Sequence, residues 1–404
     1  MKEKIKKLAV RLHPKRVVTL FDTFLQDESI GGKLILVAAL LSLIVVNSPF
    51  GGVFNQFWHI PLSIGLGSWS LSLDLRHWVN EGLMAFFFLV VGLEIKRELV
   101  KGELKDIRTA ILPIGAAVGG MLIPALVYLA FNLNTGAIQG WGIPIATDIA
   151  FAVAVLSLLS KRVPVSLKIF LLTLAIADDI GAIFVIALFY AEIINYWFLT
   201  ASFLLAIGLF LFRKQLTYRL VLVSLLGILL WITTHLSGIH ASIVGAVMGL
   251  LAPVALSSDK VGVSEKVENL FLPITTFFIL PLFAFANAGF PLSVGALTNN
   301  QSVLWGVILG LVIGKVVGIT LASWLLVKLK VAQLPKGVVW KHIIGIGFIA
   351  GIGFTVSIFI TELAFSDNQT FINTAKMGIF IASAMSALLG YVTLRSLPAP
   401  RDDK

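Results

Sequence analysis

Four charged residues stand inside long apolar stretches of this 404-residue chain: Asp148, Asp178, Asp179 and Lys315. Each charge placed at the centre of a bilayer costs at least about 2.5–3.5 kcal/mol on insertion scales, so four of them at similar depth indicate a function. A set of purely structural buried ion pairs is the alternative interpretation. The residue types favour ion chemistry, because a carboxylate can hold a proton or release it and bind a hard cation.

Asp178 and Asp179 are adjacent, and two neighbouring carboxylates in a low dielectric resist ionising together. Na⁺ and Li⁺ prefer oxygen ligands for the same reason that Ca²⁺ and Mg²⁺ do. Successive helical residues point about 100° apart, so the two carboxylates cannot face one ion equally. We expect one of them to be the primary ligand and the other a coupled second carboxylate. A site that holds either protons or a cation, but not both, is that of an antiporter.

The composition describes the elements that must position these residues. Hydrophobic residues make up 58% of the chain and charged residues 13%, about half the charged share of a soluble domain. The apolar runs are about 17–25 residues long, which is enough to span a bilayer. An all-α polytopic membrane protein is predicted, with about twelve helices near 31–50, 78–95, 107–131, 141–160, 166–191, 196–212, 217–233, 238–254, 268–290, 302–328, 340–365 and 371–395.

Basic residues set the expected orientation, because they gather in the cytoplasmic connections of membrane proteins. The net charge of +10 is concentrated in alternate connections, namely 96–108, 161–168, 213–219, 260–266 and 328–341, and in the N-terminal segment. This pattern predicts cytoplasmic termini and no nucleic-acid partner. We expect a basic segment at 1–30, one transporter domain at 31–395 and a tail at 396–404. The absence of cysteine excludes disulfides and thiolate metal or redox sites.

Two of the predicted spans look interrupted. Span 4 contains Pro144 and Asp148, and span 11 contains four glycines near its middle, Gly345, Gly347, Gly351 and Gly353. Helix-breaking residues at membrane depth are tolerated where the freed backbone lines a cavity, and a matching pair of broken helices indicates a transport site. Spans 3–5 and 10–12 would be inverted-topology repeats, with Gly119 and Gly318 in the small-residue stripes of their first helices.

The remaining charges suit the ends of these broken helices. An acid such as Asp148 would offset facing helix N-ends, and a lysine such as Lys315 would offset facing C-ends. Thr147 could contribute a hydroxyl. Near helix ends, Lys376 is interpreted as a snorkelling residue. The connection at about 57–75 is either a small external β-hairpin or an irregular loop.

Around these residues the sequence resembles the NhaA family of bacterial sodium/proton antiporters. The matching stretches are FFFLVVGLEIKREL (86–99), GIPIATDIAFA (142–152), LAIADDIGAI (174–183), SGIHAS (237–242), LPLFAFANAG (280–289) and IGFTVSIFI (352–360). They occur in order and cover nearly the whole chain.

This resemblance implies a twelve-helix fold in which spans 4 and 11 cross. It also implies an electrogenic inner-membrane antiporter that exports Na⁺ or Li⁺ in exchange for H⁺, is activated at alkaline pH and has no cofactor. Asp178 and Asp179 match the ion-binding pair, and the hairpin matches the contact of a homodimer. The residues that match a pH-regulation and funnel set are Glu81, Glu94, Arg97, Glu98, Glu268 and His240.

Several alternatives remain open at this stage. Asn269 and Leu272 stand where some family members have histidines, and VVG follows Lys315 in place of a proline-containing segment. His240 could be a structural histidine, and Glu94, Arg97 and Glu98 could be surface ion pairs. An intramembrane aspartyl protease also places two acids on neighbouring helices, but the GxGD segment of that class is absent. A sodium-coupled symporter of an organic solute would need further polar residues beside the aspartates.

Overall fold

The computed structural model describes residues 28–66, 69–159, 162–191, 193–216, 219–252, 263–292 and 300–398. Nearly all of the predicted N-terminal segment 1–30, most of the tail 396–404 and parts of the basic connections at 161, 217–218 and 253–262 lie outside these ranges. Within them the chain is mostly helical.

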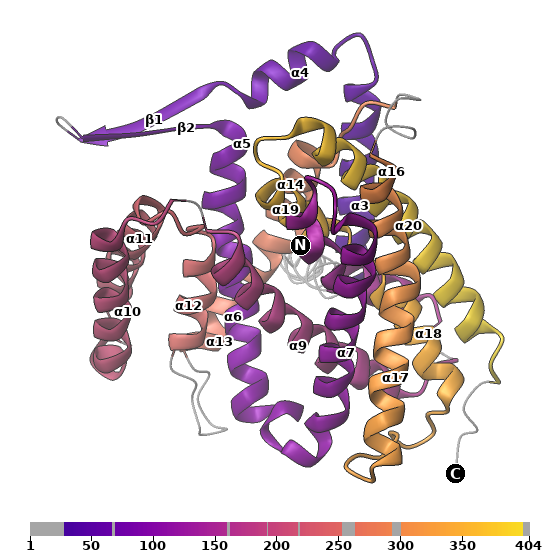
Figure 1. Cartoon of the computed structure of the whole chain (residues 1–404). Coiled ribbons are helices and arrows are strands. Elements are labelled where there is room, and N and C mark those ends of the chain that lie inside the picture. The colour runs from indigo at the N-terminus through magenta and orange to yellow at the C-terminus, as the bar shows by residue number, and fades with distance from the viewer. Residues whose placement is uncertain are drawn as a thin grey trace, which may run out of the picture.

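The helices follow one another with short connections (Figure 1). In the first half the elements are α3 (Glu28–Val46), α4 (Gly51–Trp58), β1 (Pro61–Leu66), β2 (Trp69–Asp74), α5 (Leu75–His77), η1 (Trp78–Leu83), α6 (Met84–Lys101), η2 (Glu103–Lys105), α7 (Ile107–Asn132), η3 (Ile138–Ile145), α8 (Ile149–Ser157) and α9 (Val165–Phe189). In the second half they are α10 (Tyr196–Leu216), α11 (Leu220–Leu236), α12 (Ile243–Leu251), α13 (Val263–Ile274), η4 (Thr275–Ile279), α14 (Leu280–Asn287), α16 (Gln301–Leu309), η5 (Gly310–Gly314), α17 (Lys315–Lys328), α18 (Trp340–Ala350), α19 (Phe354–Ala364) and α20 (Gln369–Arg395).

The described residues contain seven helices that are long and apolar enough to cross a membrane, or up to nine if each bent helix pair counts as one span. The chain is therefore a multi-pass membrane protein. Each of the twelve predicted ranges overlaps a helical segment. Twelve membrane crossings, however, remain a prediction, because short segments such as α12 do not reach spanning length on their own.

Spans 4 and 11 are both interrupted. In span 4 the 3₁₀ segment η3 contains Pro144, the backbone is extended at Ala146 and Asp148, and α8 then begins. In span 11, α18 and α19 meet at a 48° bend. The two interruptions lie against each other, since the backbone N–H of Asp148 donates to the carbonyl of Ile352 at 2.7 Å. Backbone groups freed by each break are thus partly satisfied by the other.

Only two of the four glycines in span 11 lie at the break. Gly351 ends α18, and Gly353 precedes α19. Gly345 and Gly347 instead lie inside α18, where a Cβ atom would meet Leu394 and the backbone of Val316. Their absence of side chains allows close helix packing, and the expectation that they belong to the interruption is corrected accordingly.

α7 and α17, the first helices of the two predicted repeats, pack closely against each other. A Cβ atom on Gly119 of α7 would meet the carbonyl oxygen of Gly318 of α17, and one on Gly318 would meet that of Gly119. The two backbones therefore touch, as the small-residue stripes predicted. Figure 1 shows α7 and α17 side by side, with α16, α18 and α20 completing this part of the molecule.

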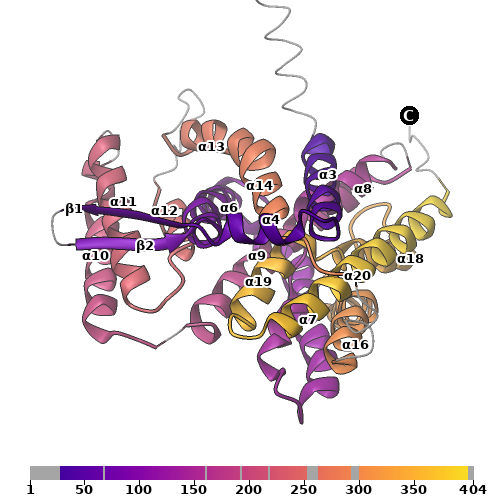
Figure 2. The ribbon, with the colours of Figure 1, turned by 90° about the horizontal axis from the view of Figure 1, so that it is seen from above.

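The segment after α4 forms a two-stranded antiparallel sheet, which decides between the hairpin and the irregular loop. Pro61 pairs with Asp74 and Ile64 with Leu71. Asp74 accepts a hydrogen bond from the backbone N–H of His77 at 2.7 Å and so begins α5. The arm formed by α4, β1 and β2 projects beyond the helices, above α10 and α11 (Figures 1 and 2).

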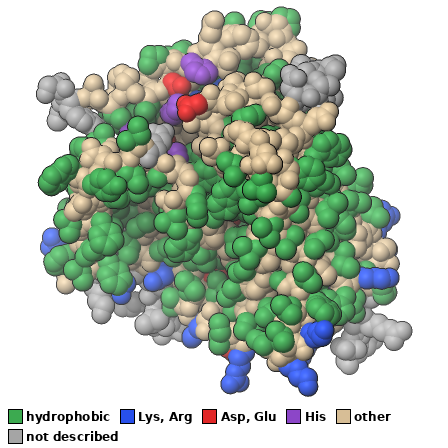
Figure 3. Space-filling model, viewed as in Figure 1, with side chains coloured by type: hydrophobic (Ala, Val, Ile, Leu, Met, Phe, Trp, Pro, Cys, Tyr) green, Lys and Arg blue, Asp and Glu red, His purple; other side chains and the backbone are tan. Residues whose placement is uncertain are grey.

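Charged side chains are unevenly distributed over the face drawn in Figure 3. Hydrophobic side chains cover its middle, Lys and Arg side chains lie toward one end, and Asp, Glu and His side chains are seen near the other. The end with Lys and Arg is the one where the connection between α6 and α7 lies in Figure 1. This distribution is typical of a membrane protein whose basic end faces the cytoplasm.

Candidate functional site

Asp148 joins the two interrupted spans at their helix N-ends. Its Oδ1 accepts a hydrogen bond from the backbone N–H of Phe151 in the first turn of α8, at 3.1 Å. Its Oδ2 accepts from the backbone N–H of Thr355 in the first turn of α19, at 3.0 Å, and from the Thr355 hydroxyl at 2.5 Å. One buried carboxylate therefore caps two helix N-termini, where negative charge is favourable.

Lys315 and Asp178 form a buried ion pair beside this junction. The Nζ of Lys315 lies 2.5 Å from Oδ2 of Asp178, and both side chains are 0% exposed. Lys315 also donates to the hydroxyl of Thr147 at 3.0 Å. That hydroxyl lies 2.7 Å from Oδ2 of Asp178 and 2.8 Å from the carbonyl of Ala350, so its single proton can serve one of these two acceptors at a time.

Thr147 thus links Lys315 to the C-end of α18, because its hydroxyl accepts a hydrogen bond from the lysine and can donate one to the carbonyl of Ala350. Ala350 is the last residue of α18, and its carbonyl is one of those that a helix leaves without an internal partner. The lysine charge is shared between this helix end, which the sequence analysis predicted as its partner, and Asp178.

Asp179 differs from the other two aspartates. It is buried, at 7% exposure, yet no hydrogen bond or ion pair joins its carboxylate to any residue in the described part of the chain. Glu94, Asp178 and Asp148 are the other acids whose charges act on it. Oδ1 of Asp178 is likewise buried and has no hydrogen-bond partner among the described residues. Carboxylate oxygens that have no hydrogen-bond partner among the described residues therefore occur on both adjacent aspartates.

The residues of the predicted regulatory set form two separate groups. In the first group, Arg97 of α6 pairs with Glu268 of α13, and Glu94 lies 3.8 Å from the same guanidinium. Glu98 instead accepts from the backbone N–H of Glu103 at 3.0 Å and holds the connection that follows α6. A second ion pair, Lys101–Glu265 at 2.6 Å, joins α6 to α13 one turn further on.

The second group lies at the opposite end of the same span. Glu81, which is 6% exposed, accepts hydrogen bonds from the backbone N–H groups of Ala241 and Ser242 at 2.6 and 3.2 Å. Nδ1 of His240 lies 2.9 Å from Oε1 of Glu81. These contacts hold the SGIHAS segment at the start of α12. About 20 Å of helix separates Glu81 from Glu94, so the two groups cannot act as one cluster.

One residue of the site was missed in the sequence, and one buried lysine outside the site was misinterpreted. The hydroxyl of Thr355 in α19 donates to Asp148, which also caps α8. Thr355 lies two residues after Gly353, and this position beside the break could have indicated its role. Lys376 is 2% exposed and pairs with Glu362 at 2.5 Å, so its interpretation as a snorkelling residue is wrong. Glu362, an acid inside the apolar second half of span 11, is the residue that could have predicted a basic partner.

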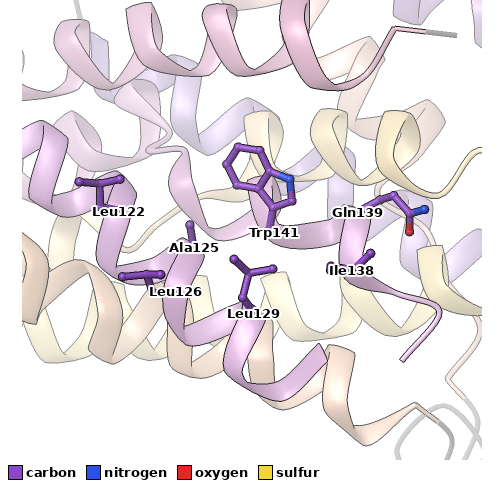
Figure 4. A pocket seen from close by; sticks show the side chains of 7 residues that line it. All are labelled: Leu122, Ala125, Leu126, Leu129, Ile138, Gln139 and Trp141. Atoms are coloured by element: carbon purple, nitrogen blue, oxygen red, sulfur yellow. The ribbon is translucent and has the colours of Figure 1, made fainter. Parts of the chain in front are cut away.

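A pocket of about 510 Å³ lies apart from these charges, between α7 and η3 (Figure 4). Its lining is apolar, including Leu122, Leu126 and Trp141, and Gln139 is its one polar side chain. No residue of the aspartate cluster contributes to it. Chemistry that involves ions therefore belongs to the interruption and not to this groove.

Comparisons with known proteins agree with this architecture. The family model described as Na⁺/H⁺ antiporter 1 matches residues 22–394. The chain is 46% identical to the Na⁺/H⁺ antiporter NhaA of Vibrio cholerae over 379 residues, which cover 93% of this chain and 97% of that protein. It is 42% identical to the Na⁺/H⁺ antiporter NhaA 2 of Clostridium beijerinckii over 402 residues, which cover 98% and 96%.

The fold also resembles a solved structure. The sodium/proton antiporter MjNhaP1 of Methanocaldococcus jannaschii aligns with a TM-score of 0.52 at 13% identity, over 94% of this chain and 99% of that one. At this identity the likeness concerns the fold alone.

Proposed function

The chain belongs to the Na⁺/H⁺ antiporter 1 family, and from the geometry of its buried charges we propose that it exchanges Na⁺ for H⁺ at Asp178 and Asp179. It is a secondary transporter and not an enzyme. The observation that carries the proposed site is the unequal use of the three aspartates. Asp148 is occupied by helix N-ends and Asp178 by Lys315, whereas Asp179 has no partner in the described residues.

In this proposal Asp179 is the primary ligand and Asp178 the coupled second carboxylate. When Asp179 is protonated, the local negative charge decreases and no cation is held. When it releases its proton, its oxygens and the unused Oδ1 of Asp178 attract a hard cation. Because protons and Na⁺ compete for the same oxygens, the apparent affinity for Na⁺ falls as the pH is lowered.

Lys315 and Thr147 restrain the second carboxylate. With Oδ2 of Asp178 engaged by Lys315 and Thr147, Oδ1 is the oxygen of Asp178 that remains for a cation, since it has no hydrogen-bond partner among the described residues. Full use of Asp178 as a ligand would require Lys315 to release Oδ2. The lysine charge therefore opposes cation binding until Asp179 is ionised, which couples the two carboxylates.

Further parts of the proposal concern the stoichiometry, the transported cations, the topology and the assembly of the protein. Exchange is proposed to be electrogenic: besides the proton of Asp179, a second proton, which Asp178 takes up when it separates from Lys315, would be released for each monovalent cation. Li⁺ is transported as well, since it also prefers oxygen ligands. Twelve spans with cytoplasmic termini follow from the basic connections, and a bacterial inner membrane follows from the family. The projecting β1–β2 arm is proposed as the contact of a homodimer.

Activation at alkaline pH is proposed to depend on both groups of the regulatory set. Arg97 lies between Glu94 and Glu268, and Glu94 in turn acts electrostatically on Asp179. A change in the charge of Glu268 would therefore be felt at the transport site through Arg97 and Glu94. Glu81 and His240 would act separately, by holding the start of α12.

The experiment that tests the function is dequenching of a ΔpH-sensitive dye in everted vesicles, resolved by pH between about 6 and 9, a window that brackets titration of a perturbed carboxylate. Na⁺ and Li⁺ should each release the proton gradient, and K⁺ serves as the control cation. Vesicles from cells that lack the protein give the background. Na⁺-dependent uptake of an organic solute without proton release would instead indicate a symporter, and cleavage of a membrane peptide would indicate a protease.

A further inference from the structure

A second ion pair, Glu362–Lys376, lies outside the transport site and joins a partly buried glutamate to a buried lysine. Glu362 stands in the last turn of α19 and Lys376 in the second turn of α20. Their charged atoms are 2.5 Å apart, and the side chains are 13% and 2% exposed. Lys376 and Lys315 are the two lysines that are almost completely buried in the described part of the chain. Arg76, in α5, is a second basic residue whose charge acts on Lys376.

Stability alone does not account for this pair. Taking two charges out of water costs several kcal/mol per ion, and apolar residues of similar size are often neutral or stabilising in their place. The pair is also unnecessary for bringing the two helices together, since only residues 365–368 separate α19 from α20. What a short ion pair adds is a constraint on the rotation and the axial position of α19 against α20.

The position of α19 decides the geometry at Asp148. Thr355 and Glu362 are seven residues apart, which places them on the same face of the helix and about 10 Å apart along its axis. Thr355 is bonded to Asp148 at one end, and Ser357 donates to the carbonyl of Ile143 at 2.8 Å. Every residue from Phe354 to Thr361 is buried, so a displacement of α19 moves its N-end within a packed interior.

We propose that Glu362 and Lys376 are positioning residues for the transport site: their ion pair holds α19 so that Thr355 remains bonded to Asp148. The pair fixes the far end of α19 to α20, and three hydrogen bonds, two from Thr355 and one from Ser357, fix its N-end to span 4. Loss of the pair would let this three-turn helix rotate or slide, and the contact with Asp148 would lengthen. This inference rests on the proposed function, because it requires that the transported ion binds beside Asp148.

The test compares paired variants with a control. The double variant Glu362→Leu/Lys376→Met removes both charges without leaving one unpaired, and Glu362→Lys/Lys376→Glu reverses the pair. Lys328→Met, at the exposed end of α17, is the matched control. We expect the apolar double variant to raise the Na⁺ concentration for half-maximal exchange about tenfold, because small misplacements of ligands are costly. The maximal rate per folded transporter should change much less, and charge reversal should lower the half-maximal concentration again.

A role confined to stability would reduce the amount of folded protein and leave the half-maximal Na⁺ concentration unchanged. A folded apolar double variant with the wild-type value therefore overturns the proposal, as does a raised value that charge reversal does not lower. If neither paired variant folds, the pair is a folding requirement and the positioning role is refuted.

A second measurement separates this inference from the function itself. The chain contains no cysteine, so Ile143→Cys/Ser357→Cys can report by disulfide cross-linking how α19 lies against η3. The cross-linking yield should fall in the apolar double variant and recover on charge reversal, even if the protein transports a different ion. An unchanged yield would show that the pair does not position α19.

Discussion

Removal of the Lys315 charge is the perturbation whose cost the structure defines best. Lys315 and Asp178 are both 0% exposed and lie 2.5 Å apart, so Lys315→Met leaves a carboxylate with no cation in contact. Breaking a buried pair from one side costs about 3–5 kcal/mol. The variant also loses the bond to Thr147, which adds about 1 kcal/mol. Together these losses correspond to roughly three to four orders of magnitude in the folding equilibrium.

The double variant Asp178→Asn/Lys315→Met should recover most of this stability, because neither charge is then left alone. Lys315→Arg retains a cation and should retain part of the activity. A carboxylate without a partner can take up a proton, so the destabilisation of Lys315→Met should decrease as the pH is lowered. Lys328→Met, which removes an exposed lysine from the other end of α17, controls for the substitution itself.

The assay is thermal unfolding in detergent at several pH values, with the exchange rate measured on the same preparations. Lys315→Met should unfold at a clearly lower temperature than the wild type, and the double variant should be stable but without exchange. Wild-type stability of Lys315→Met at alkaline pH would refute the reasoning, since the ion pair would then be dispensable. An active double variant would refute the role of Asp178.

Three further outcomes are expected. Asp179→Asn should abolish Na⁺-driven proton release at every pH while membrane insertion stays normal, and normal release would exclude the shared-carboxylate mechanism. Glu268→Gln should shift the pH of half-activation in vesicles without loss of the alkaline maximum, because it changes only the partner of Arg97; inactivity at alkaline pH would contradict this. Thr355→Val should lower stability in detergent by about 1.5–3 kcal/mol, the usual value of a hydrogen bond to a charged group, and Thr355→Ser, which keeps the hydroxyl, should not.

The elements of the fold could be predicted because membrane insertion imposes strong rules on sequence. Long apolar runs and the basic connections between them indicate where helices lie, and Pro144 and the glycines at 351 and 353 indicate where two of them break. The two glycines at 345 and 347 have the same residue type but serve close packing. Sequence alone cannot separate these uses, because the difference lies in the neighbouring helices α17 and α20.

The charged members of the site were predictable, but Thr355 and the pairing of the charges were not. An acid or a lysine inside an apolar run is conspicuous, so Asp148 and Lys315 could be recognised without a structure. Lys376 was misjudged because proximity to a helix end suggested access to the membrane surface, while its partner Glu362 lies on the preceding helix. A buried ion pair is a property of two segments at once, and the pattern of one segment does not contain it.

The arrangement of the three aspartates explains why one junction can be both rigid and reactive. Asp148 is held by donors from two helices, so its charge is already compensated by the N-ends of α8 and α19. Asp178 is held by Lys315 and Thr147 on one oxygen only. Asp179, the least restrained, stands next to it on α9. The number of fixed partners therefore decreases from Asp148 at the crossing to Asp179. Asp179 can alternate between a proton and a cation because this exchange breaks the fewest hydrogen bonds of the folded protein.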